Sequence, residues 1–186
     1  MTSQKSVRIA QETLRTLYAL APDTARASSH ASTVDRDPSD PFRATAFIGA
    51  GDADVVQFAA ERAVGGPNGL PAPTDFLCAA LAASQDSSIR MAANRWGVPL
   101  EALSVEVRGW ADVRGAMGVN RDAPVGLQTM QCTVRLAVVP GTDPERVRRM
   151  LLEAEQSCIV LATLRRAVRI YTHIERTAGE PLALAA

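Results

Sequence analysis

The most reactive side chains of this chain are its cysteines, because a thiolate is a strong nucleophile, binds metals and can be oxidised stepwise, first to a sulfenic acid. They are Cys78, Cys132 and Cys158. No two of them form a CxxC pair, and the histidines His30 and His173 lie far apart in the sequence. The sequence therefore predicts neither a disulfide framework nor a zinc site, and we expect no metal and no other cofactor.

The second feature with chemical meaning is a run of polar residues inside a long predicted helix. The helix is expected over residues 73–96, and its first half, 76–83, is apolar on all sides, which predicts burial all round. The polar run that follows consists of Ser84, Gln85, Asp86, Ser87 and Ser88. Burying an unpaired polar group costs about 1–3 kcal/mol. The helix therefore either emerges into solvent here, or these groups line a polar pocket or form a satisfied network in the core.

The N-terminal part of the chain is expected to form a small unit of its own. Residues 5–20 carry apolar side chains three or four positions apart, which predicts an amphipathic helix. Residues 22–41 are polar and rich in Ser, Asp and Pro, as is typical of a linker. We therefore divide the chain into residues 1–41, a helix with a polar linker, and residues 42–186, the main domain.

The main domain is expected to begin with a β-hairpin. Residues 42–48 and 55–59 alternate between apolar and polar side chains, and residues 49–52 supply the turn between them. A loop rich in glycine and proline then leads to the long helix. Pro73 suits the first turn of that helix, and Gly97 is a signal for its C-terminal cap.

The second half of the main domain is predicted from the same periodicities. Its elements are, in order, two long strands over 105–113 and 127–139, a helix that starts at Thr142–Glu145 and ends near Cys158, a short apolar segment over 159–164, and a last strand over 168–174. Strands separated by two substantial helices predict an α+β fold, in which the helices cover one face of the sheet.

Charge and hydropathy exclude two classes of partner. The sequence has 20 basic and 20 acidic residues and few aromatic ones, so neither a net positive field nor stacking surfaces are available to nucleic acid. It contains no run of about 18 apolar residues and no continuous apolar stretch near its start, so we expect neither a membrane span nor a signal peptide. A cytoplasmic protein is expected.

Several short motifs occur in a characteristic order and spacing. They are Gly65-Gly66 and Gly69 in the loop, Pro73 and Ala79-Ala80-Leu81 in the helix, Gly97-Val98-Pro99-Leu100 with Val105-Glu106-Val107, then Gly109, Asp112, Arg114 and Gly115, and finally Ala154-Glu155-Gln156-Ser157-Cys158. Together they resemble the OsmC/organic-hydroperoxide-resistance family. The likeness covers residues 42–175, so the N-terminal helix lies outside it.

The resemblance implies a fold and a mechanism. The fold is an intertwined homodimer in which antiparallel sheets wrap around two long central helices. In the mechanism, a first cysteine attacks an organic hydroperoxide and becomes a sulfenic acid, and a second cysteine condenses with it to a disulfide. A dithiol reductant, such as a protein-bound lipoyl group, then regenerates the pair.

This chain departs from the family at the first cysteine. That position lies eleven residues after Pro73 and is occupied by Ser84, whereas the second position keeps Cys158. A serine hydroxyl has no comparable oxidation ladder, so it cannot replace the attacking thiolate. Cys78 is no substitute, because six residues correspond to about 240° around a helix. We expect Cys78 and Cys132 to pack as small hydrophobic side chains.

The resemblance also implies an activating acid and an arginine. Thr74 occupies the position of the acid. The arginine would come from an early loop, where Arg43 and Arg62 are candidates. The candidate site therefore consists of Ser84 and Cys158 as the catalytic positions, with pocket candidates Gln85, Asp86, Ser88 and Thr74.

Several functions remain open at this stage. Cys158 alone can reduce hydroperoxides if it is exposed and an external thiol resolves its sulfenic acid, or it can be a packed remnant. Alternatively, the chain is a redox-inactive paralogue that binds a small apolar ligand. Ser84 is either an evolved loss of the cysteine or an introduced Cys→Ser exchange. A serine hydrolase is not expected, because the chain lacks a Gly-x-Ser-x-Gly motif.

Overall fold

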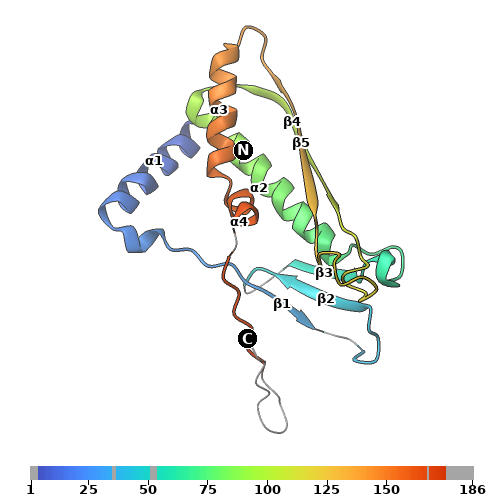
Figure 1. Cartoon of the computed structure of the whole chain (residues 1–186). Coiled ribbons are helices and arrows are strands. Elements are labelled where there is room, and N and C mark those ends of the chain that lie inside the picture. The colour runs from blue at the N-terminus through green and yellow to red at the C-terminus, as the bar shows by residue number, and fades with distance from the viewer. Residues whose placement is uncertain (1–3, 35–36, 51–53, 167, 175–186) are drawn as a thin grey trace.

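The computed structural model describes residues 4–34, 37–50, 54–166 and 168–174 of the 186-residue chain. The helices are α1 (Gln4–Leu20), α2 (Pro73–Trp96), α3 (Pro144–Ser157) and α4 (Ile159–Arg165), with short 3-10 turns η1 (Pro22–Ala25) and η2 (Arg62–Val64). The strands are β1 (Ala31–Val34), β2 (Arg43–Ile48), β3 (Asp54–Ala59), β4 (Leu100–Trp110) and β5 (Thr129–Val138). They form two antiparallel sheets, β1-β2-β3 and β4-β5, and confirm the predicted α+β class (Figure 1).

The long helix α2 begins and ends where the sequence predicts. Pro73 occupies its first turn, and the Asp75 carboxylate accepts a hydrogen bond of 2.9 Å from the backbone N–H of Ala72. Gly97 follows the last turn with φ of +63°, a left-handed conformation that glycine adopts without the steric cost of a Cβ. These two ends fix the register of the side chains along α2, including that of Ser84.

The first sheet extends further toward the N-terminus than predicted. Strand β1 lies inside residues 22–41, which were predicted to be a linker, and it pairs with β2 from Ala31 opposite Ile48 to Val34 opposite Thr45. All four residues of β1 are exposed. The strand therefore lacks the alternation of buried and exposed side chains by which a strand is recognised in a sequence. Pairing with β2 creates this strand, and local sequence patterns do not report such pairing. The division of the chain at residue 41 stays a prediction.

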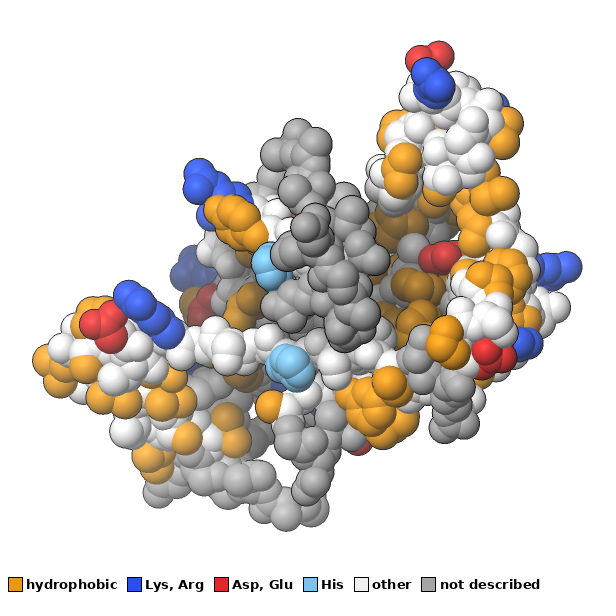
Figure 2. Space-filling model, turned by 90° about the horizontal axis from the view of Figure 1, so that it is seen from below, with side chains coloured by type: hydrophobic (Ala, Val, Ile, Leu, Met, Phe, Trp, Pro, Cys, Tyr) orange, Lys and Arg blue, Asp and Glu red, His pale blue; other side chains and the backbone are white. Residues whose placement is uncertain are grey.

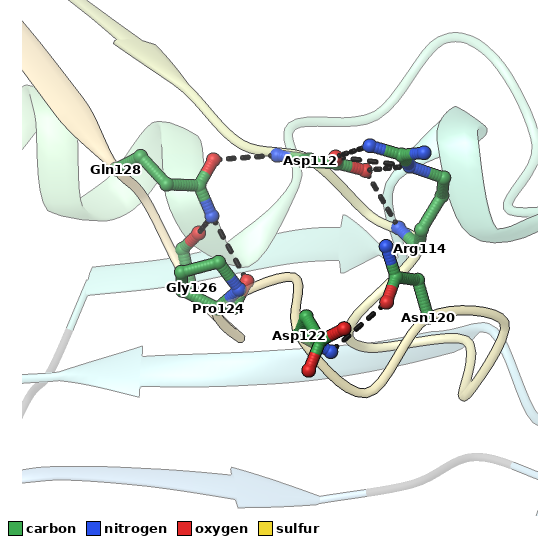
Figure 3. A network of polar contacts seen from close by, with 7 residues as sticks. All are labelled: Asp112, Arg114, Asn120, Asp122, Pro124, Gly126 and Gln128. Carbon is green, nitrogen blue, oxygen red and sulfur yellow. Dashed lines mark hydrogen bonds and ion pairs between the residues drawn. The ribbon is translucent and has the colours of Figure 1, made fainter.

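The second sheet is the β4-β5 hairpin, whose pairing runs from Leu100 opposite Val138 to Trp110 opposite Thr129. Its long connection is held by one side-chain amide (Figure 3). The Gln128 amide accepts a hydrogen bond from the backbone N–H of Asp112 at 2.6 Å and donates to the carbonyls of Pro124 and Gly126. The connection thereby holds the two strands in register at the end of the hairpin where Trp110 pairs with Thr129.

An ion pair completes the same connection. The Arg114 guanidinium and backbone N–H both donate to the Asp112 carboxylate. These hydrogen bonds lower the pKa of Asp112 to about 2. Both side chains are exposed, so the pair shapes the loop and adds little to global stability.

The core lies where α3 packs against α2, with the β4-β5 hairpin at their side (Figure 1). Ile89, Ala92 and Ala93 of α2 are buried against Met150 and Ala154 of α3. The alanines let the two helix backbones approach closely, while Ile89 and Met150 fill the remaining volume. Strand side chains close the core from the other side: Leu100 and Leu103 from β4, and Val134, Leu136 and Val138 from β5.

A polar cluster ties α1 to this core. The Glu153 carboxylate on α3 accepts hydrogen bonds from the side chains of Arg95 and Trp96 at the end of α2, and Arg15 of α1 lies 3.9 Å away. Burial raises the pKa of Glu153, but the hydrogen bonds from Trp96 and Arg95 and the arginine charges outweigh it, so the pKa of Glu153 is lowered. The carboxylate therefore stays charged and joins three helices.

The predicted last strand is not formed in the single chain. Residues 168–174 have no regular secondary structure, and Ile170 and Tyr171 are each 85% exposed. A strand needs a neighbouring strand to satisfy its backbone groups, and none of the described strands pairs with this segment. The prediction is therefore wrong for an isolated chain, although the apolar residues that motivated it are present and uncovered.

The first half of α2 is also less buried than predicted. Leu77, Ala79 and Ala80 are exposed to solvent, although the helix is apolar on every side here. Further hydrophobic side chains lie on the lower face of the molecule (Figure 2). Residues 168–174 expose apolar side chains as well, among them Val168, Ile170 and Tyr171.

The contact between α2 and α3 leads to a stability prediction. We expect Met150→Ala to lower the free energy of unfolding by about 2–5 kcal/mol, because it leaves a cavity against α2. Leu152→Ala, two residues away on the same helix, is the matched control, since Leu152 is 44% exposed. Urea unfolding followed by circular dichroism measures both. Equal effects of the two substitutions would contradict this location of the core.

Candidate thiol site

The structure brings Ser84 of α2 into contact with Cys158, although they lie 74 residues apart in the sequence. The Ser84 Oγ is 3.1 Å from the Cys158 Sγ, and either atom can be the donor. The backbone N–H of Val160 also points at the Ser84 Oγ, at 3.5 Å. The Cys158 side chain is 0% exposed. A half-buried hydroxyl and a buried thiol are therefore in direct contact.

The backbone of Cys158 is fixed from both sides. The residue lies between α3 and α4 in an extended conformation, with φ of −74° and ψ of 107°. Its N–H donates to the carbonyl of Glu155 at the end of α3, and its carbonyl accepts from the N–H of Ala162 in α4. The helix–helix junction thus holds the sulfur against α2.

A cavity of about 810 Å³ lies between α2, β5, α3 and α4; neither Ser84 nor Cys158 lines it, but Gln85, the residue after Ser84, does. Most of its walls are apolar, with Leu77, Leu81 and Ile89 from α2, Met130, Val134 and Leu136 from β5, and Leu161 and Leu164 from α4. The polar side chains on its wall include Gln85, which is buried, and Glu155, which forms an ion pair of 2.7 Å with Arg165. The cavity suits an apolar molecule that carries one polar group.

Cys132 forms part of the same cavity wall, and the prediction that it packs in the core is wrong. It is an exposed free cysteine, on the face of β5 that also carries Met130 and Val134. Burial raises the pKa of Cys132, and the negative charges of Cys158 and Glu155 raise it further. The alternation of side chains along β5 is a signal that Cys132 faces the helices. A sequence does not show whether the helices cover this part of the strand.

The predicted pocket residues have different surroundings in the structure. Gln85 lines the large cavity, and Asp86 instead pairs with Arg90 at 2.6 Å on the helix surface. Ser88 is buried, with 4% of its surface exposed. Thr74 lies at the start of α2 and lines a different cavity of about 380 Å³. Of the four candidates, Gln85 alone is placed on the wall of the large cavity.

Cys78 belongs to that other cavity together with Thr74, Asp75 and Trp110. Its sulfur is half-buried against the backbone of Gly109, where an added Cβ would lie 3.4 Å from it. Burial and the Asp75 charge raise the pKa of Cys78. This is consistent with a packed thiol that faces away from Ser84, as the helical spacing predicted.

The remaining expectations concern arginines, metals and membranes. Arg43 pairs with Asp40 at 3.1 Å and does not reach the site. Among the described residues, no group of three or more His, Cys, Asp or Glu side chains is arranged to hold a metal ion. Within the same ranges, no helix combines the length and the apolar character that crossing a membrane requires.

The fold and the site define a class of α+β protein in which one long helix and a helix–helix junction hold a thiol against a hydroxyl, beside an apolar cavity. The sequence profile described as OsmC-like protein matches residues 66–173, more than half of the chain. The chain therefore belongs to the OsmC-like family.

Solved structures share this fold at low sequence identity. An OsmC-like protein from Mycoplasma pneumoniae has 15% identity and a TM-score of 0.60, over 76% of this chain and 89% of that one. An OsmC-like protein of unknown function from Vibrio cholerae has 12% identity and a TM-score of 0.60, over 74% and 94%. An organic hydroperoxide resistance protein, OsmC, from Legionella pneumophila has 18% identity and a TM-score of 0.52, over 76% and 91%. The comparison with curated proteins found no match.

The contact between Ser84 and Cys158 predicts the outcome of one exchange. In Ser84→Cys, two sulfur atoms occupy positions that are now 3.1 Å apart, so we expect mild oxidation to join them as an intramolecular disulfide. Ala83→Cys, the adjacent position on the exposed side of α2, is the control and should form no such bond. Non-reducing peptide mapping by mass spectrometry measures both. A free thiol at position 84 after oxidation would contradict the geometry.

Proposed function

We propose that this chain is a one-cysteine relative of the organic hydroperoxide reductases, in which Cys158 is the redox thiol and Ser84 its hydrogen-bonding partner. The 3.1 Å contact between their side chains carries the proposal. The name of the similar Legionella pneumophila structure, an organic hydroperoxide resistance protein, supports the choice of substrate class. The apolar cavity next to the pair is large enough for the organic part of such a molecule.

The proposed reaction needs one thiol in the protein and an external dithiol. The Cys158 sulfur attacks the terminal oxygen of ROOH, the O–O bond breaks, and the alkoxide takes up the thiol proton to leave as ROH. The products are a sulfenic acid on Cys158 and an alcohol. A dithiol, such as a protein-bound lipoyl group, then reduces the sulfenic acid to the thiol and becomes a disulfide, with release of water.

Ser84 contributes to this step without being oxidised. Its hydroxyl is placed to donate a hydrogen bond to the sulfur when the thiolate forms, or to an oxygen of the hydroperoxide bound next to it. Its backbone partner, the N–H of Val160, restricts the directions in which the hydroxyl can point. Ser84 is therefore a positioning residue in this proposal.

Access to Cys158 needs a local opening, which the sequence did not predict. The side chain is 0% exposed, whereas the one-cysteine hypothesis requires an exposed thiol. Cys158 contributes to the wall of a shallow cavity of about 470 Å³, with Thr163 and Arg166 of the α4 end. Ile159, the next residue, is exposed. A small displacement of α4 against α3 would open this side.

We further propose that the chain acts as a homodimer in the cytoplasm. The exposed apolar surface of α2 and the uncovered segment 168–174 together need a partner, and a second copy supplies matching surfaces. A site that depends on a reduced thiol suits a compartment in which thiols are kept reduced.

The burial of Cys158 favours a second candidate function, a redox-inactive protein that binds a small apolar ligand. In that case the cavity of about 810 Å³ is the binding site, and Gln85 with the Glu155–Arg165 pair recognises the polar end of the ligand. Ser84 and Cys158 would then pack its wall. Saturable binding of an apolar acid without loss of hydroperoxide would distinguish this function from the first.

Hydroperoxide turnover tests the first proposal. We expect the protein to consume cumene hydroperoxide with dihydrolipoamide as the reductant, and Cys158→Ser to abolish this activity. Ser84→Ala should lower the rate by about five- to tenfold, the equivalent of a hydrogen bond of about 1–1.5 kcal/mol. Cys78→Ser, in the other cavity, is the matched control and should leave the rate unchanged.

Two outcomes would overturn the proposal. Full activity of Cys158→Ser would place the redox chemistry on another thiol. Inactivity of the unsubstituted protein, together with activity of Ser84→Cys, would show that the scaffold is competent and that the serine disarms it. Thermal unfolding of every variant ensures that a loss of activity is not a loss of fold.

A further inference from the structure

The shallow cavity at the junction of α3 and α4 is the one that Cys158 itself lines. Its volume is about 470 Å³. Its wall has apolar residues, among them Ile159 and Ala162, and polar ones, among them Thr163 and Arg166. Of the described residues, no acidic one belongs to this wall. The cavity therefore offers one positive charge and no negative charge to a molecule that approaches the thiol.

Two adjacent arginines at the end of α4 have different surroundings. The Arg165 guanidinium forms an ion pair of 2.7 Å with Glu155 and lines the larger, apolar cavity. The exposed Arg166 lines the cavity of Cys158, and within the described residues its guanidinium has neither an ion pair nor a hydrogen bond. Its backbone N–H ends α4 by donating to the carbonyl of Thr163. A guanidinium without a partner on a cavity wall is suited to bind a carboxylate in a bidentate way.

Helix geometry places Arg166 and Cys158 on the same side of α4. Cys158, Ala162 and Arg166 follow one another at intervals of four residues, and the N–H of Ala162 donates to the carbonyl of Cys158. Residues at such intervals are neighbours on one face of a helix. Eight residues of helix measure about 12 Å, and the long arginine side chain covers part of this length. A molecule in the shared cavity can therefore contact Arg166 with one end and approach Cys158 with the other.

We propose that Arg166 is a specificity-determining residue of the thiol site, and that it binds the carboxylate of an organic hydroperoxide whose O–O group reacts with Cys158. The inference rests on the proposed function and narrows its substrate class. The apolar part of the molecule lies along Ile159 and Ala162. The reaction at the sulfur is unchanged: Cys158 takes up the terminal oxygen, and the alkoxide takes up the thiol proton and leaves as an alcohol. The carboxylate is not altered.

The larger cavity suits a charged substrate less well. The charges of Glu155 and Arg165 on its wall compensate each other, and most of the remaining wall is apolar. A carboxylate in that cavity would lose hydration without gaining an unpaired cation. In the shallow cavity, Arg166 is exposed, so the carboxylate keeps part of its hydration when it pairs with the guanidinium. Because Cys158 is buried, the reaction still needs the displacement of α4 described above.

Two substrates that differ in charge test the inference on the full chain. They are para-carboxycumene hydroperoxide and its methyl ester, which share the same O–O group, with dihydrolipoamide as the reductant for both. We expect Arg166→Gln to lower kcat/KM for the carboxylate substrate by about five- to tenfold, because a charged hydrogen-bonded pair is lost, and to leave kcat/KM for the ester unchanged. Arg166→Lys keeps the charge and should lose less than Arg166→Gln.

Arg149→Gln is the matched control. It removes one positive charge from an exposed position of α3 outside the cavity, and its partner Glu145 keeps the ion pair with Arg148. We expect it to leave kcat/KM for both substrates unchanged. Three results would overturn the inference: no effect of Arg166→Gln on the carboxylate substrate, an equal loss for both substrates, or the same loss in Arg149→Gln. The last two would be effects of folding or of total charge.

A measurement without hydroperoxide separates the inference from the proposed function. The reagents para-(bromomethyl)benzoate and its methyl ester alkylate thiols with loss of bromide, and peptide mass spectrometry gives the rate of each at Cys158. We expect Arg166→Gln to lower the ratio of the benzoate rate to the ester rate by about five- to tenfold. A lowered ratio without consumption of either hydroperoxide would support the anion site and contradict the peroxidase function. Turnover of both hydroperoxides with an unchanged ratio would keep the function and overturn the inference.

Discussion

The packing of α3 against α2 is the constraint on which the thiol site depends. Buried alanines on both helices bring their backbones together, and Ile89 and Met150 set the depth of the contact. This packing sets the position of the C-terminal end of α3, and it thereby places Cys158 in contact with Ser84. The same packing leaves the wall of β5 uncovered beyond the core, which creates the cavity. The site is therefore a consequence of helix packing.

The chemistry that this arrangement allows is that of a thiol with restricted access. The Ser84 hydroxyl is the hydrogen-bonding partner of the Cys158 thiol. Without such a partner, burial of a polar group would be costly. The apolar cavity offers space for an organic molecule, and its wall carries a second thiol.

Helices α1, α2 and α3 and the hairpins follow from local patterns in the sequence, and so do the ends of α2, whereas α4 was expected only as a short apolar segment. Proline at its start, aspartate in its first turn and glycine after it are signals that act over a few residues. The features that were not predicted depend on contacts between distant parts of the chain. Strand β1 exists because β2 pairs with it, and residues 168–174 lack a strand because no partner is present. Cys132 was assigned to the core because alternation gives the face of a strand but not whether that face is covered.

The central claim is that Cys158 reduces organic hydroperoxides, and the most direct measurement is the amount of alcohol formed per chain in a single turnover. The protein is mixed with excess cumene hydroperoxide in the absence of reductant, and cumyl alcohol is quantified by chromatography. Our account predicts one alcohol molecule for each chain that carries Cys158, and none for Cys158→Ser. Formation of the alcohol by Cys158→Ser at the same level, or its absence with the unsubstituted protein, would contradict the account.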